Sequence, residues 1–170
     1  INRLKSTRIK IGQIIYLSKP KKSNHPPSVG TQLGLRSTKS IINLNSSAVL
    51  VTDQLSGETM LEKNPDAVLP IASITKLMTA LVIIEKNMDL SEKITISKAD
   101  ARLERYNKSR LSVGSRFSRE DLLHLALMSS ENRAAHALAR SYPGGIRGFV
   151  EAMNAKAKLL GMWSTVFTEP

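Results

Sequence analysis

Basic side chains are unevenly distributed along this chain, and their distribution limits where a folded core can form. Residues 1–45 contain nine Lys or Arg and no Asp or Glu, and they are interrupted by Pro20, Pro26 and Pro27. The whole chain has 25 basic and 14 acidic residues, so 16 against 14, or +2, remain for residues 46–170. Because blocks of like charge repel and stay solvated, we expect a flexible arm at 1–45 and a folded domain at 46–170.

The basic arm suggests a polyanionic partner, but its composition restricts the choice. Nucleic-acid-binding segments combine basic residues with aromatic platforms, and Tyr16 is the only aromatic residue before position 46. We therefore expect no nucleic-acid partner. A solvated linker or leader remnant is the simplest interpretation, and peripheral contact with an anionic membrane surface is the alternative.

Composition excludes several other classes of protein. The length of 170 residues suits one ordinary domain, and no apolar run approaches the roughly 20 residues that a membrane span requires. The absence of cysteine excludes disulfides, thiol catalysis and thiolate metal sites. Residues 1–17 are basic and contain a broken apolar stretch with no small-residue cleavage site after it, so we expect that any signal peptide has been removed.

Residue spacing in the body predicts a mixed α/β fold. Residues 47–62 read as a β-hairpin with a turn at Ser56-Gly57, and residues 64–70 form a Pro-containing loop. A helix should follow at about 73–85. Its expected buried face recurs at three-and-four spacing and comprises Ile74, Leu77, Met78, Leu81 and Val82.

The second half of the body predicts three more helices. Residues 91–117 are expected to be irregular, and Ser118 should cap a buried helix that ends near Ser129-Ser130. An Ala-rich helix should follow Asn132 and stop before Pro143. The fourth helix should end at Gly161, and its apolar side comprises Phe149, Val150, Met153, Ala157 and Leu160. Residues 163–170 could form a strand or an extended loop.

Two short motifs could carry chemistry: S-I-T-K at 73–76 and S-E-N at 130–132. Both patterns arise readily by chance, and a second S-x-x-K at 18–21 lies in the Pro-broken arm, where nothing would fix its geometry. Context distinguishes the motif at 73–76, because positions i and i+3 share one face at the start of the predicted helix. Lys76 can therefore reach the hydroxyl of Ser73.

A serine hydroxyl needs an adjacent base to become a nucleophile, and a lysine can serve only when it is neutral. Burial, a nearby cation or the positive end of a helix would favour neutral Lys76. Asn132 could hold Lys76 and a substrate carbonyl while Ser130 passes a proton to a leaving amine. The alternative is that Ser73, Ser130 and Asn132 only cap helices and that Lys76 is solvated.

The remaining polar residues suggest no further chemistry. No metal-binding pattern or Gly-rich phosphate loop occurs. His124 and His136 lie alone in apolar helices, so we expect structural roles for both.

The block P-I-A-S-I-T-K-L-M-T-A resembles the active-site region of the low-molecular-weight penicillin-binding proteins, the serine D,D-peptidases. The block L-L-H-L-A-L-M-S-S-E-N-R-A-A, followed by Y-P-G-G and A-M-N-A-K-A-K-L-L-G-M, resembles the D-alanyl-D-alanine endopeptidase type of this family. The resemblance covers about residues 46–170. It implies a β-lactamase-like α/β fold and a periplasmic location, with no metal or cofactor.

The resemblance also implies roles for individual residues. Ser73 would be the acylated nucleophile, Lys76 its general base, and Ser130 and Asn132 the second motif. The implied substrate is the peptide of peptidoglycan, cut at a D-Ala cross-link through an acyl-enzyme. β-Lactam antibiotics would act as covalent inhibitors.

One departure from the family pattern is the absence of K-T-G, K-S-G or H-T-G. In the family this third motif lies on a sheet strand that lines the cleft and supplies one N–H of the oxyanion hole. Losing one such donor typically costs about 10²–10³ in rate. We therefore expect a truncated chain with missing C-terminal sheet strands, an exposed hairpin edge and little turnover.

Three other activities compete with the endopeptidase. A D,D-carboxypeptidase would use the same residues on a terminal D-Ala. A β-lactamase is disfavoured because the sequence offers no recognisable separate deacylation base. A non-catalytic module that binds the cell wall or another polyanion through the arm is the alternative of a different class.

Overall fold

The structure is a computed structural model that describes residues 44–101 and 109–170, and these residues have a mixed α/β fold. They belong to two compact units. One contains residues 71–159 and 165–170, and the other contains 160–164 with the described part of 1–70. The predicted arm lies outside the described residues, except for its last two positions.

The first described elements are the strands of the expected β-hairpin. Strands β1 (Val49–Thr52) and β2 (Thr59–Lys63) pair antiparallel, with Val51 opposite Leu61. The turn between them is held by Asp53, whose Oδ1 accepts hydrogen bonds from the backbone N–H groups of Leu55 and Ser56. Gly57 supplies the left-handed backbone that the turn needs, with φ of 74°. The predicted hairpin is therefore confirmed.

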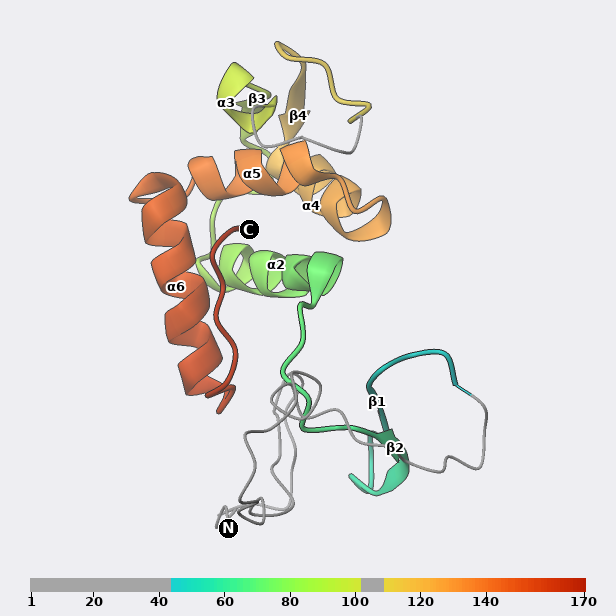
Figure 1. Cartoon of the computed structure of the whole chain (residues 1–170). Coiled ribbons are helices and arrows are strands. Elements are labelled where there is room, and N and C mark those ends of the chain that lie inside the picture. Colours follow the sequence, from blue (N-terminus) through green and yellow to red (C-terminus); the bar gives the residue numbers. More distant parts are fainter. Residues whose placement is uncertain (1–43, 102–108) are drawn as a thin grey trace, which may run out of the picture. The chain divides into compact units, whose positions relative to one another are not determined.

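The unit of residues 71–159 and 165–170 is mainly helical (Figure 1). Its helices are η1 (Ala72–Ile74, a 3₁₀ helix), α2 (Thr75–Glu85), α3 (Lys98–Ala101), α4 (Arg119–Met128), α5 (Asn132–Arg140) and α6 (Gly145–Leu159). Helix α5 packs against α2, α4 and α6, and α2 also contacts α4 and α6. Together they enclose a core whose largest fully buried apolar side chains are Ile83, Ile96, Leu122, Leu138, Phe149 and Met153.

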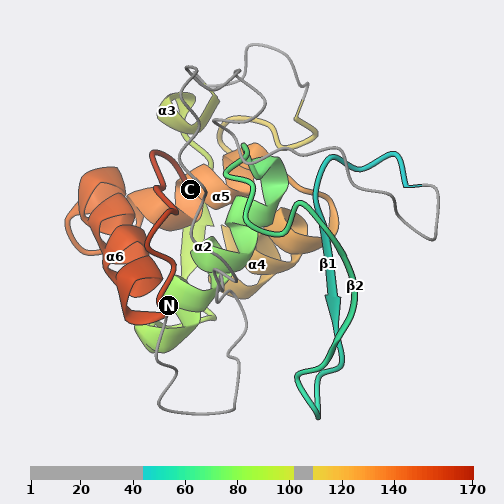
Figure 2. The ribbon, with the colours of Figure 1, turned by 60° about the horizontal axis from the view of Figure 1, so that its bottom comes forward.

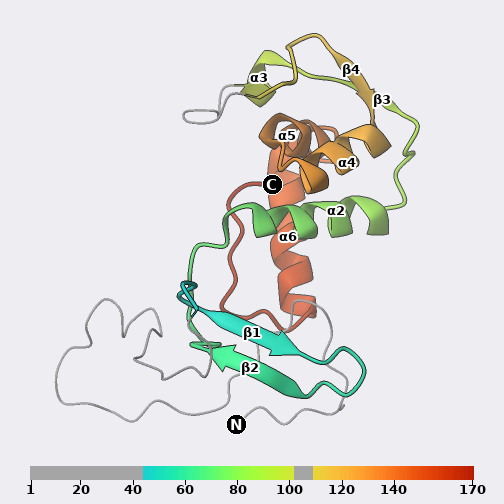
Figure 3. The same cartoon turned by 90° about the vertical axis from the view of Figure 1, so that its right-hand side faces the viewer.

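A second two-stranded antiparallel sheet lies almost entirely within the segment expected to be irregular. Strands β3 (Lys93–Thr95) and β4 (Arg116–Ser118) pair antiparallel, with Ile94 opposite Phe117 (Figure 3). The expectation for 91–117 was therefore wrong in part. Each strand has only three residues, so the sequence pattern is too short to reveal it, although the alternating Ile94 and Ile96 are both buried.

The helix boundaries follow the sequence closely. The Ser118 side chain accepts a hydrogen bond from the Asp121 N–H and Asp121 returns one to Ser118, which makes a capping box at the start of α4. Gly161, with φ of 77°, follows the end of α6 as predicted. Residues 163–170 form no strand.

The predicted buried face of α2 was wrong in part. Ile74 and Leu77 are each 62% exposed, whereas Met78 and Val82 are buried as expected. The buried side of α2 also includes Lys76, a polar residue that hydrophobic spacing cannot identify. The apolar α4 likewise buries only part of its surface, because Leu127 and Met128 are exposed. Within the described ranges, no helix combines the length and hydrophobicity needed to cross a membrane.

Candidate active site

Ser73 lies at the start of the α2 region, but inside η1 rather than in the α-helix itself. The preceding Ala72 has a left-handed backbone with φ of 45°, which is unfavourable for a residue with a Cβ atom. Such local strain is concentrated at functional sites in proteins. The Ser73 side chain is exposed, so its hydroxyl is accessible to a substrate.

Lys76 is one helical turn beyond Ser73 and is buried, with only 6% of its surface exposed. Its Nζ atom lies 3.4 Å from Ser73 Oγ and 2.7 Å from Asn132 Oδ1. The first distance is at the long end of the hydrogen-bond range, as is common for catalytic pairs without substrate. The amine therefore joins the start of α2 to the start of α5.

The surroundings of Lys76 favour its neutral form. Burial lowers the pKa of Lys76, because the desolvated ammonium is less stable than the amine. The charges of Glu169 and Glu131 oppose this shift. No carboxylate of the described residues forms an ion pair with Lys76.

Asn132 is the first residue of α5, and its side chain is exposed apart from the contact with Lys76. Ser130, two residues earlier, is also exposed and has a left-handed backbone with φ of 55°. Among the residues that the structure describes, the Ser130 hydroxyl makes no hydrogen bond to Ser73, Lys76 or Asn132. The structure thus brings three of the four predicted residues into contact and leaves Ser130 beside them in the chain.

Helix capping does not account for these residues. The residue before α2 is Ile74, which makes no side-chain cap, and η1 begins after Ile71 without one. Helix α5 is capped by Glu131, whose side chain accepts a hydrogen bond from the Arg133 N–H. The simple capping alternative for Ser73, Ser130 and Asn132 is therefore wrong.

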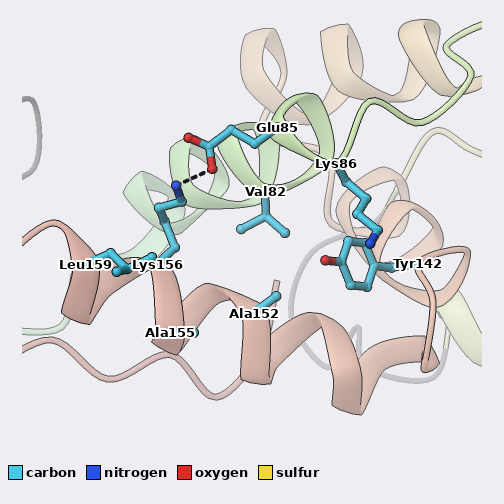
Figure 4. A pocket seen from close by; sticks show the side chains of 8 residues that line it. All are labelled: Val82, Glu85, Lys86, Tyr142, Ala152, Ala155, Lys156 and Leu159. Carbon is cyan, nitrogen blue, oxygen red and sulfur yellow. Dashed lines mark ion pairs between the residues drawn. The ribbon is translucent and has the colours of Figure 1, made fainter.

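A separate hollow of about 250 Å³ lies between the C-terminal half of α2 and helix α6 (Figure 4). Val82 and Leu159 line its apolar part, and an ion pair between Lys156 and Glu85 closes one side. None of the four predicted site residues lines it. It lies toward the opposite end of α2 from Ser73.

Sequence reasoning missed one polar cluster beside the site. His136, expected to be isolated, has its Nδ1 atom 2.9 Å from Oδ1 of Asp100, and Asp100 also pairs with Arg140. The spacing of His136 and Arg140, four residues apart on one helix, was the available signal. His124 is exposed, and His25 lies outside the described residues. No group of acidic or histidine side chains in the described part could hold a metal ion.

The hairpin and the helical cluster with this serine, lysine and asparagine have the fold class of the penicillin-binding proteins. Figure 2 shows a further view of the fold of this chain. Penicillin-binding protein 5 from Haemophilus influenzae superposes on it with a TM-score of 0.68 at 26% identity, over 78% of this chain and 40% of that one. Residues 35–170 match the S11 peptidase family of D-alanyl-D-alanine carboxypeptidases, and the chain belongs to this family. The resemblance noted in the sequence is confirmed.

Two curated relatives are more similar in sequence. The D-alanyl-D-alanine endopeptidase of Pseudomonas aeruginosa is 54% identical over 127 residues, which cover 75% of this chain and 41% of that protein. The D-alanyl-D-alanine endopeptidase of Escherichia coli is 42% identical over 144 residues, or 85% of this chain and 46% of that protein. The chain therefore spans less than half the length of these relatives.

Proposed function

We propose that this chain carries the nucleophile half of a serine D,D-peptidase that cleaves D-Ala cross-links in peptidoglycan. The observation that carries the proposal is the buried Lys76 amine, which lies between Ser73 Oγ at 3.4 Å and Asn132 Oδ1 at 2.7 Å. A base of lowered pKa next to an exposed hydroxyl is the arrangement that activates a serine. The two endopeptidases that share 54% and 42% identity with the chain favour this activity.

The proposed reaction proceeds through an acyl-enzyme. Neutral Lys76 takes the proton of the Ser73 hydroxyl while Oγ attacks the carbonyl carbon of the D-Ala residue. The tetrahedral intermediate then collapses, and the C–N bond breaks as the leaving amine takes the proton of the Lys76 ammonium through Ser130, which leaves Lys76 neutral again. Water then attacks the resulting ester and gives a proton to Lys76. As the ester C–O bond breaks, that proton passes to Ser73 Oγ, and the carboxylic acid product is released.

Asn132 has two tasks in this proposal. Its Oδ1 atom holds the Lys76 amine, and its NH₂ group is left to donate to a carbonyl of the substrate peptide. Ser73 stands at the N-terminal end of α2, where the helix dipole favours the negative charge of the developing oxyanion. No metal or cofactor takes part in these steps.

We also propose the surroundings in which this chemistry would take place. Peptidoglycan is extracytoplasmic, so a peptidase of this type would act in the periplasm. A β-lactam presents a strained amide to the same serine, and its opening would leave a stable ester on Ser73 Oγ. β-Lactams would therefore be covalent inhibitors, which gives the proposal a direct probe.

Labelling with a fluorescent penicillin tests the proposed nucleophile. We expect one covalent adduct, located on Ser73 by peptide mass spectrometry and absent from Ser73→Ala. Ser129→Ala is the matched control, because Ser129 is the exposed C-cap of α4 and takes no part in the hydrogen bonds that join the three clustered residues. No adduct in a folded sample, or an adduct that survives Ser73→Ala, would contradict the proposal.

Cross-linked muropeptides distinguish the two D,D-peptidase activities. An endopeptidase converts dimers to monomers, whereas a carboxypeptidase releases terminal D-Ala and leaves the cross-links intact. We expect the first result. Release of D-Ala with intact dimers would assign the chain to a carboxypeptidase instead.

A further inference from the structure

Asp100 in α3 is a buried carboxylate, with 1% of its surface exposed. Both of its oxygens accept hydrogen bonds. Oδ2 accepts from the backbone N–H and the hydroxyl of Ser97 at 2.7 and 2.8 Å. Arg140 binds both oxygens, from Nε and Nη2, each at 2.9 Å, and His136 Nδ1 lies 2.9 Å from Oδ1. Asp100 therefore ties α3 to two residues of α5.

The two residues that Asp100 holds share their helix with Asn132. Positions 132, 136 and 140 are four apart, so they occupy successive turns along one side of α5. Helix α5 lies between α2 and the segment that contains α3 and β3 (Figures 1 and 3). Arg140 Nη2 also donates to the Thr95 carbonyl at 2.8 Å. One end of α5 thus meets Lys76, while its later turns are fixed to α3 and β3.

The apolar packing of α5 is made mainly by small side chains. Four of its five buried residues are alanines, at positions 134, 135, 137 and 139. Small side chains form shallow ridges, so they resist rotation of a helix less than large interdigitating side chains do. Helix α5 also follows Ser130, whose left-handed backbone sets the direction of the chain just before the helix. Polar contacts of fixed geometry are therefore the features best suited to define its setting.

We propose that Asp100 is a positioning residue for the candidate active site. By holding His136 and Arg140, it fixes the rotation of α5 and keeps Asn132 Oδ1 within hydrogen-bond distance of Lys76 Nζ. The proposal rests on the proposed function only for its catalytic consequence. Its structural content concerns Lys76 and Asn132 and can be measured without any turnover.

The test is a double-mutant cycle between Asp100→Asn and Asn132→Ala, read out by the pKa of Lys76. The pKa is followed by NMR in protein labelled with ¹³C at the lysine ε-carbon, and the Lys76 signal is assigned by its loss in Lys76→Arg. Asn132→Ala should lower this pKa, because Asn132 Oδ1 stabilises the ammonium. Asp100→Asn should lower it in the parent protein and leave it unchanged in the Asn132→Ala background.

Two outcomes would overturn the proposal. An unchanged pKa in Asp100→Asn would show that α5 keeps its setting without the carboxylate. An equal change in both backgrounds would show a long-range effect of the Asp100 charge, independent of Asn132. Glu92→Gln is the matched control, because it weakens the ion pair of another buried residue, Arg119, and should leave the pKa of Lys76 unchanged.

Acylation by fluorescent penicillin supplies the catalytic readout. Asp100→Asn should slow labelling about tenfold in the parent, since small displacements of reacting groups have large effects on rate, and less than about twofold in Asn132→Ala. If the parent is not labelled at all, the proposed function fails, while the NMR cycle still decides the role of Asp100. If circular dichroism shows that Asp100→Asn is unfolded, His136→Gln takes its place in the NMR cycle, because this variant retains the pairing of Asp100 with Arg140. The same outcomes then decide the proposal.

Discussion

Lys76 and Arg119 are both buried basic side chains of the same helical unit, but the hydrogen-bond partners of one are neutral and those of the other include a carboxylate. Arg119 is fully buried, and its guanidinium pairs with the Glu92 carboxylate and donates to Ser141 Oγ and the Asp89 carbonyl. Lys76 is almost as deeply buried, but its hydrogen-bond partners are the neutral oxygens of Ser73 and Asn132. A bonded carboxylate therefore balances the charge of Arg119, whereas Lys76 has no bonded carboxylate.

This difference distinguishes the structural cation Arg119 from the lysine that we propose as a general base. A buried charge with a bonded counterion and satisfied donors is stable in its ionised form. Lys76 is buried without a bonded carboxylate, and burial lowers its pKa, so the amine loses its proton more readily than an exposed lysine does. Burial alone therefore does not distinguish the proposed base from a structural cation, whereas the charge of the bonded partners does.

The largest effect is expected from replacing Lys76 with a cation that cannot lose its proton. Lys76→Arg keeps a positive charge at the site, but a guanidinium remains protonated in proteins. We expect acylation by fluorescent penicillin to slow by about 10³-fold, the contribution typical of a general base. Stopped-flow labelling measures the rate. Labelling at an unchanged rate would remove Lys76 from the mechanism and break the contrast with Arg119.

A smaller effect is expected for the stability that Asp100 contributes, because this buried carboxylate, like Arg119, is hydrogen-bonded to oppositely charged or polar partners. Burial opposes ionisation of Asp100, but hydrogen bonds from Arg140, His136 and Ser97 lower its pKa from 3.8 to about 2. A pKa that is lower in the folded state adds stability above the unfolded pKa, and this stability is lost as the pH falls. Between pH 4 and pH 2 we expect a loss of about 2 kcal/mol that is specific to Asp100.

Urea unfolding at pH 6, 4, 3 and 2 measures this loss, with Asp100→Asn as the reference. The variant lacks the titrating group, so its free energy of unfolding should fall less over the same interval. Parallel curves for the two proteins would show that the Asp100 pairing contributes no pH-dependent stability.

Glu92→Gln tests the Arg119 side of the comparison. The Glu92 side chain is 54% exposed, so its pairing with Arg119 is partly screened by solvent. We expect the free energy of unfolding to fall by about 1 kcal/mol, while the rate of acylation stays within about twofold of the parent. Urea unfolding and penicillin labelling measure the two quantities. A large loss of labelling with little loss of stability would make the Arg119 pair part of the site.

The sequence predicts the hairpin and the long helices because each carries a local signal. Ser56-Gly57 marks a turn, and Ser118 and Gly161 mark helix ends through interactions within a few residues. The three-residue strands β3 and β4 carry no such signal, since their pairing joins residues 21 to 25 positions apart. Tertiary packing also decides which side of α2 is buried, and so Ile74 and Leu77 were assigned to the wrong face.

The candidate site was predictable to a similar degree. The i, i+3 spacing places Lys76 beside Ser73, and the structure has the pair at 3.4 Å. The contact between Lys76 and Asn132 spans 56 positions, so only the motif and the family resemblance pointed to it. The Asp100 cluster has no motif at all. Asp100 lies in α3, whereas His136 and Arg140 lie in α5, so no local sequence pattern connects the carboxylate with its partners.

The smallest predicted effect refines the statement that Lys76 has no bonded counterion. Glu169 carries a charge that raises the pKa of Lys76, although the carboxylate forms no ion pair with it. Phe167, two residues earlier, is buried and exchanges hydrogen bonds of 2.8 and 2.9 Å with the Asn154 side chain, which fixes this segment to α6. Glu169→Gln should therefore lower the pKa of Lys76 and increase the neutral fraction near pH 7.

We expect labelling by fluorescent penicillin at pH 7 to become faster in Glu169→Gln, by no more than about fivefold, because the exposed Glu169 carboxylate is screened by solvent and forms no ion pair with Lys76. The gain should vanish above the pKa of Lys76, where the amine is already neutral in both proteins. A rate profile from pH 6 to 10 measures both features, and Glu151→Gln, on the exposed side of α6, is the matched control. Slower labelling in Glu169→Gln would mean that this carboxylate assists the reaction directly. Lys76 would then depend on a nearby carboxylate, as Arg119 does.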